Sequence, residues 1–249
     1  MNFWNKKNTI EFFNDEPSII ETFPIIEHKD LKLEWVKRAR QDFQNIVKDG
    51  GDKKPGFGHL TKCPGIFELF KYGYVIRLHR DIIIESHGDQ FSYSIAKTGP
   101  EGLDVEGQLH WNPNILPKAP WAHPFILKIT TGWHVIAPKG IKFMMLPIAY
   151  PDTFDFTSTL GIFNPAECTQ VNFQLWWTAE EKKTLLRAGT PLGVLVPLSE
   201  KKYQMIQRSA TVQDKLWVSK MDSIYSSSFW HHTLRNKIVE MYNNYWKKQ

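Results

Sequence analysis

The sequence predicts an α+β protein that is mainly β, with an antiparallel β-sandwich or barrel as its core and flanking N- and C-terminal helices. Short runs that are apolar, or that alternate apolar and polar residues, recur from residue 74 to 198, and turn-forming Gly, Pro and Asn separate them. Closely spaced strands without long helices between them are typical of antiparallel sandwiches and barrels. Before and after this region, apolar residues recur three, four and seven positions apart, which predicts helices.

The N-terminal part divides into an irregular stretch and a helix. Residues 1–30 are expected to be extended or irregular. Over residues 31–48, apolar side chains at helical spacing alternate with Lys and Arg, so we expect an amphipathic helix. Asp30 is the expected N-cap and Gly50–Gly51 the expected stop. A short second helix is expected over residues 64–72, opened by a proline and followed by a glycine.

The central region should supply the strands of the core. We expect a turn at Thr131-Gly132 and a short helix over residues 179–188. Because neighbours on a strand face opposite sides of a sheet, one of Trp176 and Trp177 should enter the core. The protein's own helices, a partner or a ligand should cover the other. The expected strands are residues 74–84, 91–95, 124–130, 133–138, 141–148, 171–177 and 191–198.

The C-terminal tail is expected to be helical. Residues 211–246 contain neither Pro nor Gly and show partial helical periodicity, so we expect one or two helices packed on the β core. The chain is therefore expected to divide into three parts. Residues 1–60 form an extended segment and an amphipathic helix packed on the core, residues 61–205 form the β-rich core, and residues 206–249 form a helical appendage.

Composition and charge predict a soluble protein that stays in the cytoplasm. The net charge is only +5, from 31 basic and 26 acidic residues, and no basic run reaches five residues, so a nucleic-acid partner has weak support. The longest uncharged apolar stretch, residues 143–150, is too short to cross a membrane. Two cysteines do not form a disulfide scaffold, and the N-terminus lacks the apolar core of a signal peptide.

One short motif has the spacing of a metal site. His87 and Asp89 form a His-x-Asp pair near the end of an expected strand. A non-haem Fe(II) oxygenase holds its metal with two His and one carboxylate, and by chain order His134 is the best candidate for the third ligand. A competing interpretation is that the pair lies in an ordinary turn, with Asp89 bonding to its own backbone. We favour the turn.

The oxygenase interpretation names further residues. His110 and His123 compete with His134 as the third metal ligand. In enzymes that use 2-oxoglutarate with Fe(II), a basic residue about one strand further on binds the distal carboxylate, and Lys142 is available for that role. No GxSxG or HExxH motif is present, and we assign no catalytic residue from the sequence.

Several segments, in their order along the chain, resemble a family of uncharacterised proteins encoded by tailed bacteriophages, many of them marine. The resemblance covers about residues 1–205 and implies a phage protein made in the host cytoplasm, with virion association as one outcome. It implies no assigned activity. The segments are MNFWNKK, KCPGIFELFKYGYVIRLHRDIII, APWAHPFILKITTGWHVIAPKG and AGTPLGVLVPL.

A fainter similarity concerns the fold. The order GWHVIAPKG, LGIFNP, VNFQLWW and LLRAGTPLGVLVPL is similar to that of the dUTPase and dCTP deaminase barrel. At the chemical positions the chain departs from that family. Asn164 stands where the catalytic aspartate would be, residues 138–142 replace the serine motif, and Leu195 falls near the usual Gln. The similarity implies a related barrel with a phosphate-sized pocket near Lys139–Lys142, but an amide cannot act as a general base.

The sequence thus predicts an uncharacterised phage-encoded protein with a binding or assembly role, without catalysis, whose partner is a protein: itself, or a phage or host protein. Two alternatives stay open. One is an Fe(II)/2-oxoglutarate-dependent oxygenase that uses His87, Asp89 and His134. The other is a nucleotide-binding, dUTPase-like barrel.

Overall fold

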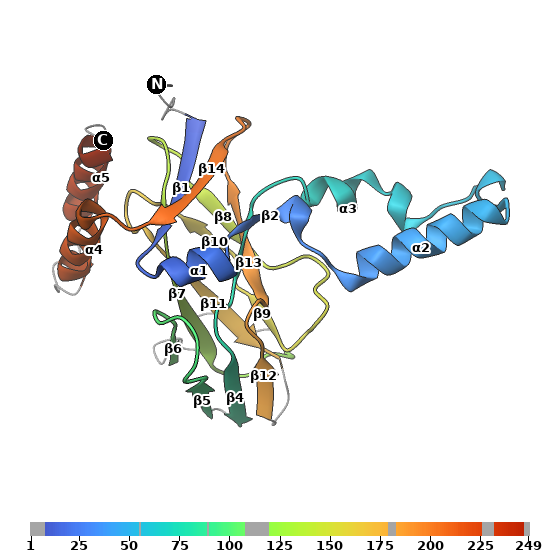
Figure 1. Cartoon of the computed structure of the whole chain (residues 1–249), viewed down its shortest axis with the longest axis horizontal. Coiled ribbons are helices and arrows are strands. Elements are labelled where there is room, and N and C mark those ends of the chain that lie inside the picture. Colours follow the sequence, from blue (N-terminus) through green and yellow to red (C-terminus); the bar gives the residue numbers. More distant parts are fainter. Residues whose placement is uncertain are drawn as a thin grey trace.

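The structure, a computed structural model, describes residues 8–54, 56–88, 90–107, 120–178, 183–225 and 232–246. The α+β, mainly β prediction is confirmed (Figure 1). Antiparallel sheets form the body of the molecule. Helices from the N-terminal part of the chain lie on one side of it, and the C-terminal helices lie on the other. The described strands form no closed barrel, and they group into two larger sheets and one small sheet.

The largest sheet contains one strand pair that the sequence did not predict. Strand β1 lies between β14 and β7, and it runs parallel to β14, from Thr9 opposite Gln204 to Asn14 opposite Ser209. All the other pairs in the sheet are antiparallel. This first sheet has the order β14 (Gln204–Ser209), β1 (Thr9–Asn14), β7 (Ile126–Ile136), β11 (Gln170–Trp177) and β9 (Phe156–Ser158), with β6 (Asp104–Gly107) also on β7.

The other two sheets are entirely antiparallel. The second sheet has the order β10 (Gly161–Phe163), β8 (Phe143–Leu146), β13 (Pro191–Pro197), β3 (Tyr74–Arg77) and β2 (Ile26–Glu27). The third has the order β12 (Lys183–Leu186), β4 (Ile82–His87) and β5 (Gln90–Ile95).

The three sheets share one aromatic-rich core. Phe12, Trp133 and Phe173 of the first sheet are fully buried in one cluster with Phe143 of the second. As predicted, one of the paired tryptophans enters this core: Trp177 is 0% exposed, whereas Trp176 is partly exposed on the opposite face. The large rings leave no room for a side chain at Gly193, where a Cβ would lie 2.3 Å from Cε1 of Phe173.

Two helices cover the outer face of the first sheet. α4 (Val212–Tyr225) and α5 (His232–Trp246) contribute Trp217 and Tyr242 to a separate cluster that also contains Phe13 of β1. The hydroxyl of Tyr242 accepts a hydrogen bond from the backbone N–H of Ala137 at 3.1 Å. The predicted C-terminal helices are confirmed. The expected boundary between residues 205 and 206 falls inside β14.

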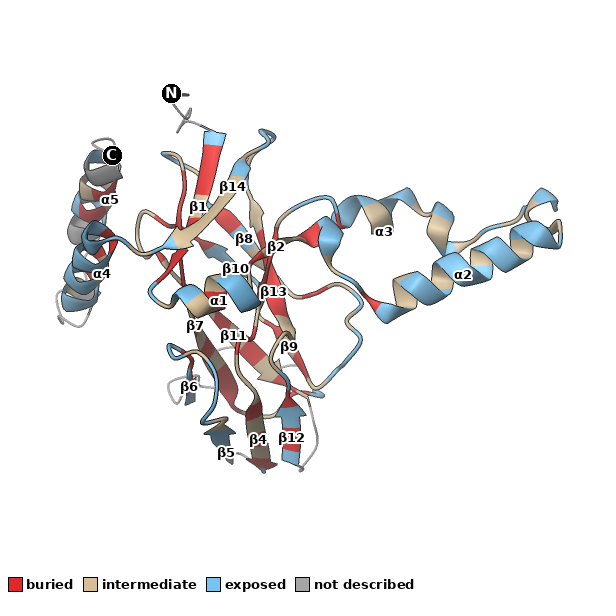
Figure 2. Ribbon diagram, in the orientation of Figure 1, coloured by how far each residue is buried: buried red, intermediate tan, exposed pale blue. Residues whose placement is uncertain are grey.

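A helical arm projects from the other side of the molecule (Figures 1 and 2). It comprises residues 31–73, with α2 (Glu34–Lys48) running outward and α3 (Pro64–Leu69) on the returning chain. The predicted amphipathic helix is confirmed, but no residue of α2 is buried. At the base of the arm, Leu33 and Phe70 are buried in a third cluster against Val75 of β3.

Several local predictions are wrong. The expected strand over residues 74–84 is two strands, β3 and β4, which lie in different sheets. Asp30 does not cap α2, whose N-cap position is Leu33. Gly132 does not form a turn between two strands, because β7 runs through it with φ +68 at a β-bulge opposite Gln170 and Asn172. In the expected 179–188 helix, residues 183–186 are instead strand β12, which pairs with β4.

The described part of residues 1–30 is more regular than the sequence predicted. A short helix, α1 (Pro17–Thr22), follows β1 and buries Ile19. No helix in the described ranges is long and apolar enough to cross a membrane.

Candidate functional site at the base of the arm

His87 lies in a tight hairpin at one end of the β core. It is the last residue of β4 and pairs with Gln90 of β5, so only two residues connect the strands. Gly88 has φ +60, as such short hairpins require, and its carbonyl oxygen lies 3.0 Å from Nδ1 of His123. The side chain of His87 is 68% exposed. Asp89 lies outside the described residues.

His134 lies near the other end of the core. It sits in β7 beside β1, where its ring stacks on Phe13 at 4.9 Å and its Nδ1 is 3.1 Å from Oγ1 of Thr169. Burial lowers the pKa of His134 to about 4, although the carboxylates of Asp15 and Asp214 act in the opposite direction. This histidine is therefore neutral at physiological pH.

The structure does not bring the two predicted histidine ligands together. His123, which contacts the β4–β5 hairpin, precedes the start of β7 at Ile126, whereas His134 lies near the far end of that strand, beside β1. Among the described residues, no group of three or more His, Cys, Asp or Glu side chains could hold a metal ion. The full triad includes Asp89 and stays a prediction, which iron analysis of the purified protein would test.

The barrel similarity names Asn164 and Lys142, and both make hydrogen bonds within the chain. Asn164 forms a turn in which its Oδ1 accepts from the N–H of Ala166 at 3.2 Å, and its Nδ2 donates to Glu167. Lys142 has an exposed side chain just before β8, and its carbonyl accepts from the N–H of Leu198 at 2.9 Å. His110, the other alternative ligand, lies outside the described residues.

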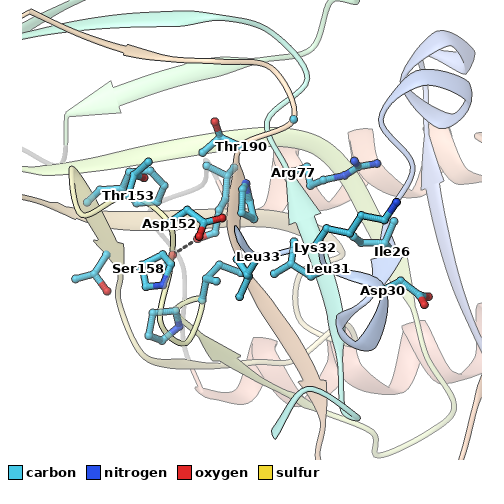
Figure 3. Close-up of a pocket in the computed structure, with 18 residues that line it drawn as sticks. Ile26, Asp30, Leu31, Lys32, Leu33, Arg77, Asp152, Thr153, Ser158 and Thr190 are labelled. Carbon is cyan, nitrogen blue, oxygen red and sulfur yellow. Dashed lines mark hydrogen bonds between the residues drawn. The ribbon is translucent and has the colours of Figure 1, made fainter. Parts of the chain in front are cut away.

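A cavity of about 440 Å³ lies where the arm meets the core (Figure 3). Its walls come from residues 26–33 before α2, Arg77 on β3, residues 147–153 after β8, residues 156–158 on β9, and residues 189–192 at the start of β13. Small-molecule pockets in proteins commonly have volumes in this range. No motif in the sequence pointed to it, because its walls come from segments far apart in the chain.

The two ends of the cavity differ in chemistry. Arg77 and Lys32 extend toward the same end in Figure 3, and both carry a positive charge. Thr153 and Ser158 lie at the other end, where Ser158 Oγ donates to the carbonyl of Leu192. Between the ends the lining is largely apolar: Ile26, Leu31, Leu33, Pro147, Ile148 and Pro191.

The sequence placed Arg77 only as a strand residue. Tyr74 and Ile76 of β3 point into the main core, whereas Val75 points toward the arm. Arg77 lies on the same face as Val75, because side chains alternate along a strand. Its Nη2 donates to the carbonyl oxygen of Pro24 at 2.8 Å, and its Nε is buried without a hydrogen-bond partner.

The chain segment after β8 joins the cavity to the arm. Asp152 caps α2: each of its carboxylate oxygens lies 3.1 Å from the backbone N–H of Glu34. The indole Nε1 of Trp35 donates to the carbonyl oxygen of Tyr150 at 2.8 Å. Tyr150 has φ +52, a left-handed conformation that is costly for a bulky residue. The contacts to α2 therefore hold this segment in a strained shape.

An apolar groove lies on the other side of the same segment. It has a volume of about 380 Å³, and Trp35, Leu60, Ile66, Tyr150 and Phe154 line it. Several of these rings and aliphatic groups reach solvent, since Leu60 is 41% exposed, Tyr150 56% and Phe154 75%. Contiguous exposed apolar side chains mark interaction surfaces more often than inert ones.

No protein-family model, curated protein or solved structure matches the chain.

Proposed function

We propose that this chain is a phage-encoded binding or assembly protein, made in the host cytoplasm, that engages a protein partner through its helical arm and the apolar groove at the base of that arm. The observation that carries the proposal is the arm itself. A 15-residue helix projects from the β core and buries none of its residues. Isolated helices of that length are marginal in water, so a partner that packs on this one would add stability.

The arm has enough internal structure to present a defined surface. Phe43 of α2 stacks with Phe57 of the returning chain at 6.4 Å and contacts the ring of His59 at 5.2 Å. The ammonium of Lys62 lies over the Phe57 ring at 4.6 Å. These contacts hold the two sides of the arm together, while its outer surface stays exposed (Figure 2).

The charge of the arm indicates the character of the partner. Residues 32–71 contain nine Lys and Arg and five Asp and Glu, a formal charge of +4 out of +5 for the whole chain. The apolar groove lies next to this basic surface. A partner protein with apolar anchors and acidic neighbours would complement both features.

The experiment uses the full chain and two variants. Leu60→Glu/Phe154→Glu places charges in the groove. Leu160→Glu is the matched control, because Leu160 is 74% exposed, like Phe154 at 75%, but does not line the groove. Each protein is analysed by size-exclusion chromatography with light scattering, and by affinity capture from phage-infected cells with mass spectrometry.

We expect the wild type and Leu160→Glu to form the same oligomer or to retain the same partner, and the groove variant to lose it. If all three proteins are monomers that retain nothing and the chain is absent from purified virions, the proposal is wrong. If the partner retained is a nucleic acid, the role of the groove as a protein-binding surface is wrong.

A further inference from the structure

We propose that the cavity at the base of the arm is a binding site for a small molecule that carries a phosphate or carboxylate group on an apolar body. Arg77 and Lys32 would hold the anionic group, and the apolar walls would hold the rest. This inference does not rest on the proposed protein-binding role, because a separate set of side chains carries it.

Arg77 has lost contact with water without gaining an ion pair among the described residues. Its guanidinium is half-buried, yet it makes one described hydrogen bond, to a backbone carbonyl, and forms no ion pair with a described carboxylate. Burial lowers the pKa of Arg77, which is the sign of a charge that has lost water without gaining an anion. An anion in the cavity would replace the lost solvation. The planar guanidinium suits carboxylate and phosphate groups in particular.

Lys32 brings a second positive charge to the cavity. It extends toward the same end of the cavity as Arg77 (Figure 3), and its exposed side chain has no ion pair among the described residues. Two cations at one end of a cavity repel each other, and an anion between them removes that repulsion. The arrangement therefore favours a ligand with at least one negative charge.

The acidic residues of the cavity do not neutralise this end. Asp152 uses both carboxylate oxygens to cap α2, and in Figure 3 it lies toward Thr153 and Ser158. Asp30 lies at the same end of the cavity as Lys32 in that view, with its carboxylate turned away from the Arg77 guanidinium. Neither acid forms an ion pair with Lys32 or Arg77 in the described part of the chain.

The lining between the two ends of the cavity is apolar. Ile26, Leu33, Ile148 and the prolines 147 and 191 offer no charge and few hydrogen bonds to a ligand. An inorganic ion would leave this wall bare, whereas a ligand with an apolar body would bury surface against it, at about 25 cal/mol for each Å² removed from water. The hydroxyls of Thr153 and Thr190 add polar contacts at the rim.

Four probes, titrated into the full-length protein by isothermal calorimetry, test this chemistry: hexyl phosphate, hexanoate, inorganic phosphate and 1-hexanol. We expect hexyl phosphate or hexanoate to bind at least roughly tenfold more tightly than inorganic phosphate, because six methylene-type carbons are then buried. Hexanol should show no binding. The tighter of the two amphiphilic anions identifies the group that the site prefers. If neither binds more tightly than inorganic phosphate, the proposal is overturned.

Variants place the binding at this cavity. Lys32→Ala and Arg77→Lys should each weaken binding roughly five- to tenfold, the latter because an ammonium lacks the planar fork. Lys37→Ala is the matched control, an exposed lysine of α2 that does not line the cavity. Equal losses for Lys32→Ala and Lys37→Ala would overturn the assignment. Because Arg77 also bonds Pro24, its variant is checked by thermal unfolding, and Lys32→Ala carries the test if Arg77→Lys unfolds.

The protein-binding proposal and the anion-binding proposal can be tested independently of each other. The groove variant Leu60→Glu/Phe154→Glu should lose the protein partner and still bind the preferred anion. Lys32→Ala should lose the anion and keep the partner. A groove variant that loses anion binding while its melting temperature stays at the wild-type value would overturn the separation between cavity and groove.

Discussion

The carboxylate of Asp152 accepts hydrogen bonds from the backbone N–H of Glu34, 118 residues away in the sequence, with 3.1 Å to each oxygen. The helix that begins the arm is thus capped from the loop after β8 and not from its own flanking residues. This contact links the arm, the cavity wall and the apolar groove through one side chain.

Loss of this cap should loosen the first turn of the arm. Asp152→Ala is expected to cost about 1 kcal/mol, the usual effect of removing a helix N-cap, and Asp152→Asn less, since the amide oxygen still accepts. Hydrogen exchange at the amides of Glu34 to Lys37 measures the effect. Asp49→Ala, at the other end of α2, is the control and should leave these amides unchanged. Unchanged exchange in Asp152→Ala would contradict the capping role.

Glycine at position 193 should be required by the close approach of two sheets. A Cβ there would lie 2.3 Å from Cε1 of Phe173 and 2.9 Å from the carbonyl oxygen of Leu146. Gly193→Ala should therefore destabilise the protein by about 1–3 kcal/mol through overpacking. Chemical denaturation measures the loss. Gly58→Ala meets no atom within 4 Å and is the control. Equal stability of the two variants would show that the sheets are further apart than described.

The start of α4 should depend on a buried ion pair. Thr211 and Asp214 cap each other's backbone N–H groups, and Arg208 donates to Asp214, whose side chain is 0% exposed. Asp214→Asn is expected to cost about 2 kcal/mol, in the range of charged hydrogen bonds, because Arg208 keeps its second partner Glu11. Urea denaturation at pH 7 measures this, with the exposed Asp222→Asn as control.

The same pair should show a defined pH dependence. Burial alone would raise the pKa of Asp214, but hydrogen bonds from Arg208 and Thr211 outweigh it and lower the pKa. A lowered folded pKa means that the unfolded state binds the proton more readily, so the stabilisation is present above about pH 4 and is lost as pH falls through the folded value. A wild-type and an Asp214→Asn protein with parallel stability curves below pH 4 would contradict this.

Two buried histidines should make the protein less stable in mild acid. Burial lowers the pKa of His79 and of His134 to about 4. Below pH 6.5 the unfolded chain takes up protons that the folded protein does not, so stability falls from pH 6.5 toward pH 4, by roughly 3 kcal/mol for each histidine. His134→Gln should flatten this slope in urea denaturation curves taken across that range. A slope that is unchanged in His134→Gln would contradict the assignment.

Regular local patterns were sufficient to predict much of the fold. Alternation along residues 171–177 predicted β11 and the burial of one of its two tryptophans, and Trp177 is fully buried. Helical spacing predicted α2 and the C-terminal helices. Such patterns arise because apolar side chains on the buried face recur every 3.6 residues in a helix and every two residues in a strand. They are therefore visible in the local sequence alone.

Features that depend on distant partners were not predicted. Residues 183–186 form β12 because β4 offers them an edge to pair with, although they follow an expected helix start. β1 joins β14 in a parallel pair across nearly the whole chain, and Gly132 sits inside a strand because β7 bulges there against β11. Neither pairing leaves a local signal in the sequence.

The candidate site also depends on contacts between distant segments that the sequence did not indicate. In the sequence, Arg77 is one residue of an expected strand and Lys32 one residue of the expected amphipathic helix, and no prediction names Asp152. All three residues line one cavity because the arm packs on the second sheet and the loop after β8 lies at the base of the arm. Period and composition specify which faces are buried, whereas the identity of the segments that meet across those faces is set by packing and strand pairing over the whole chain.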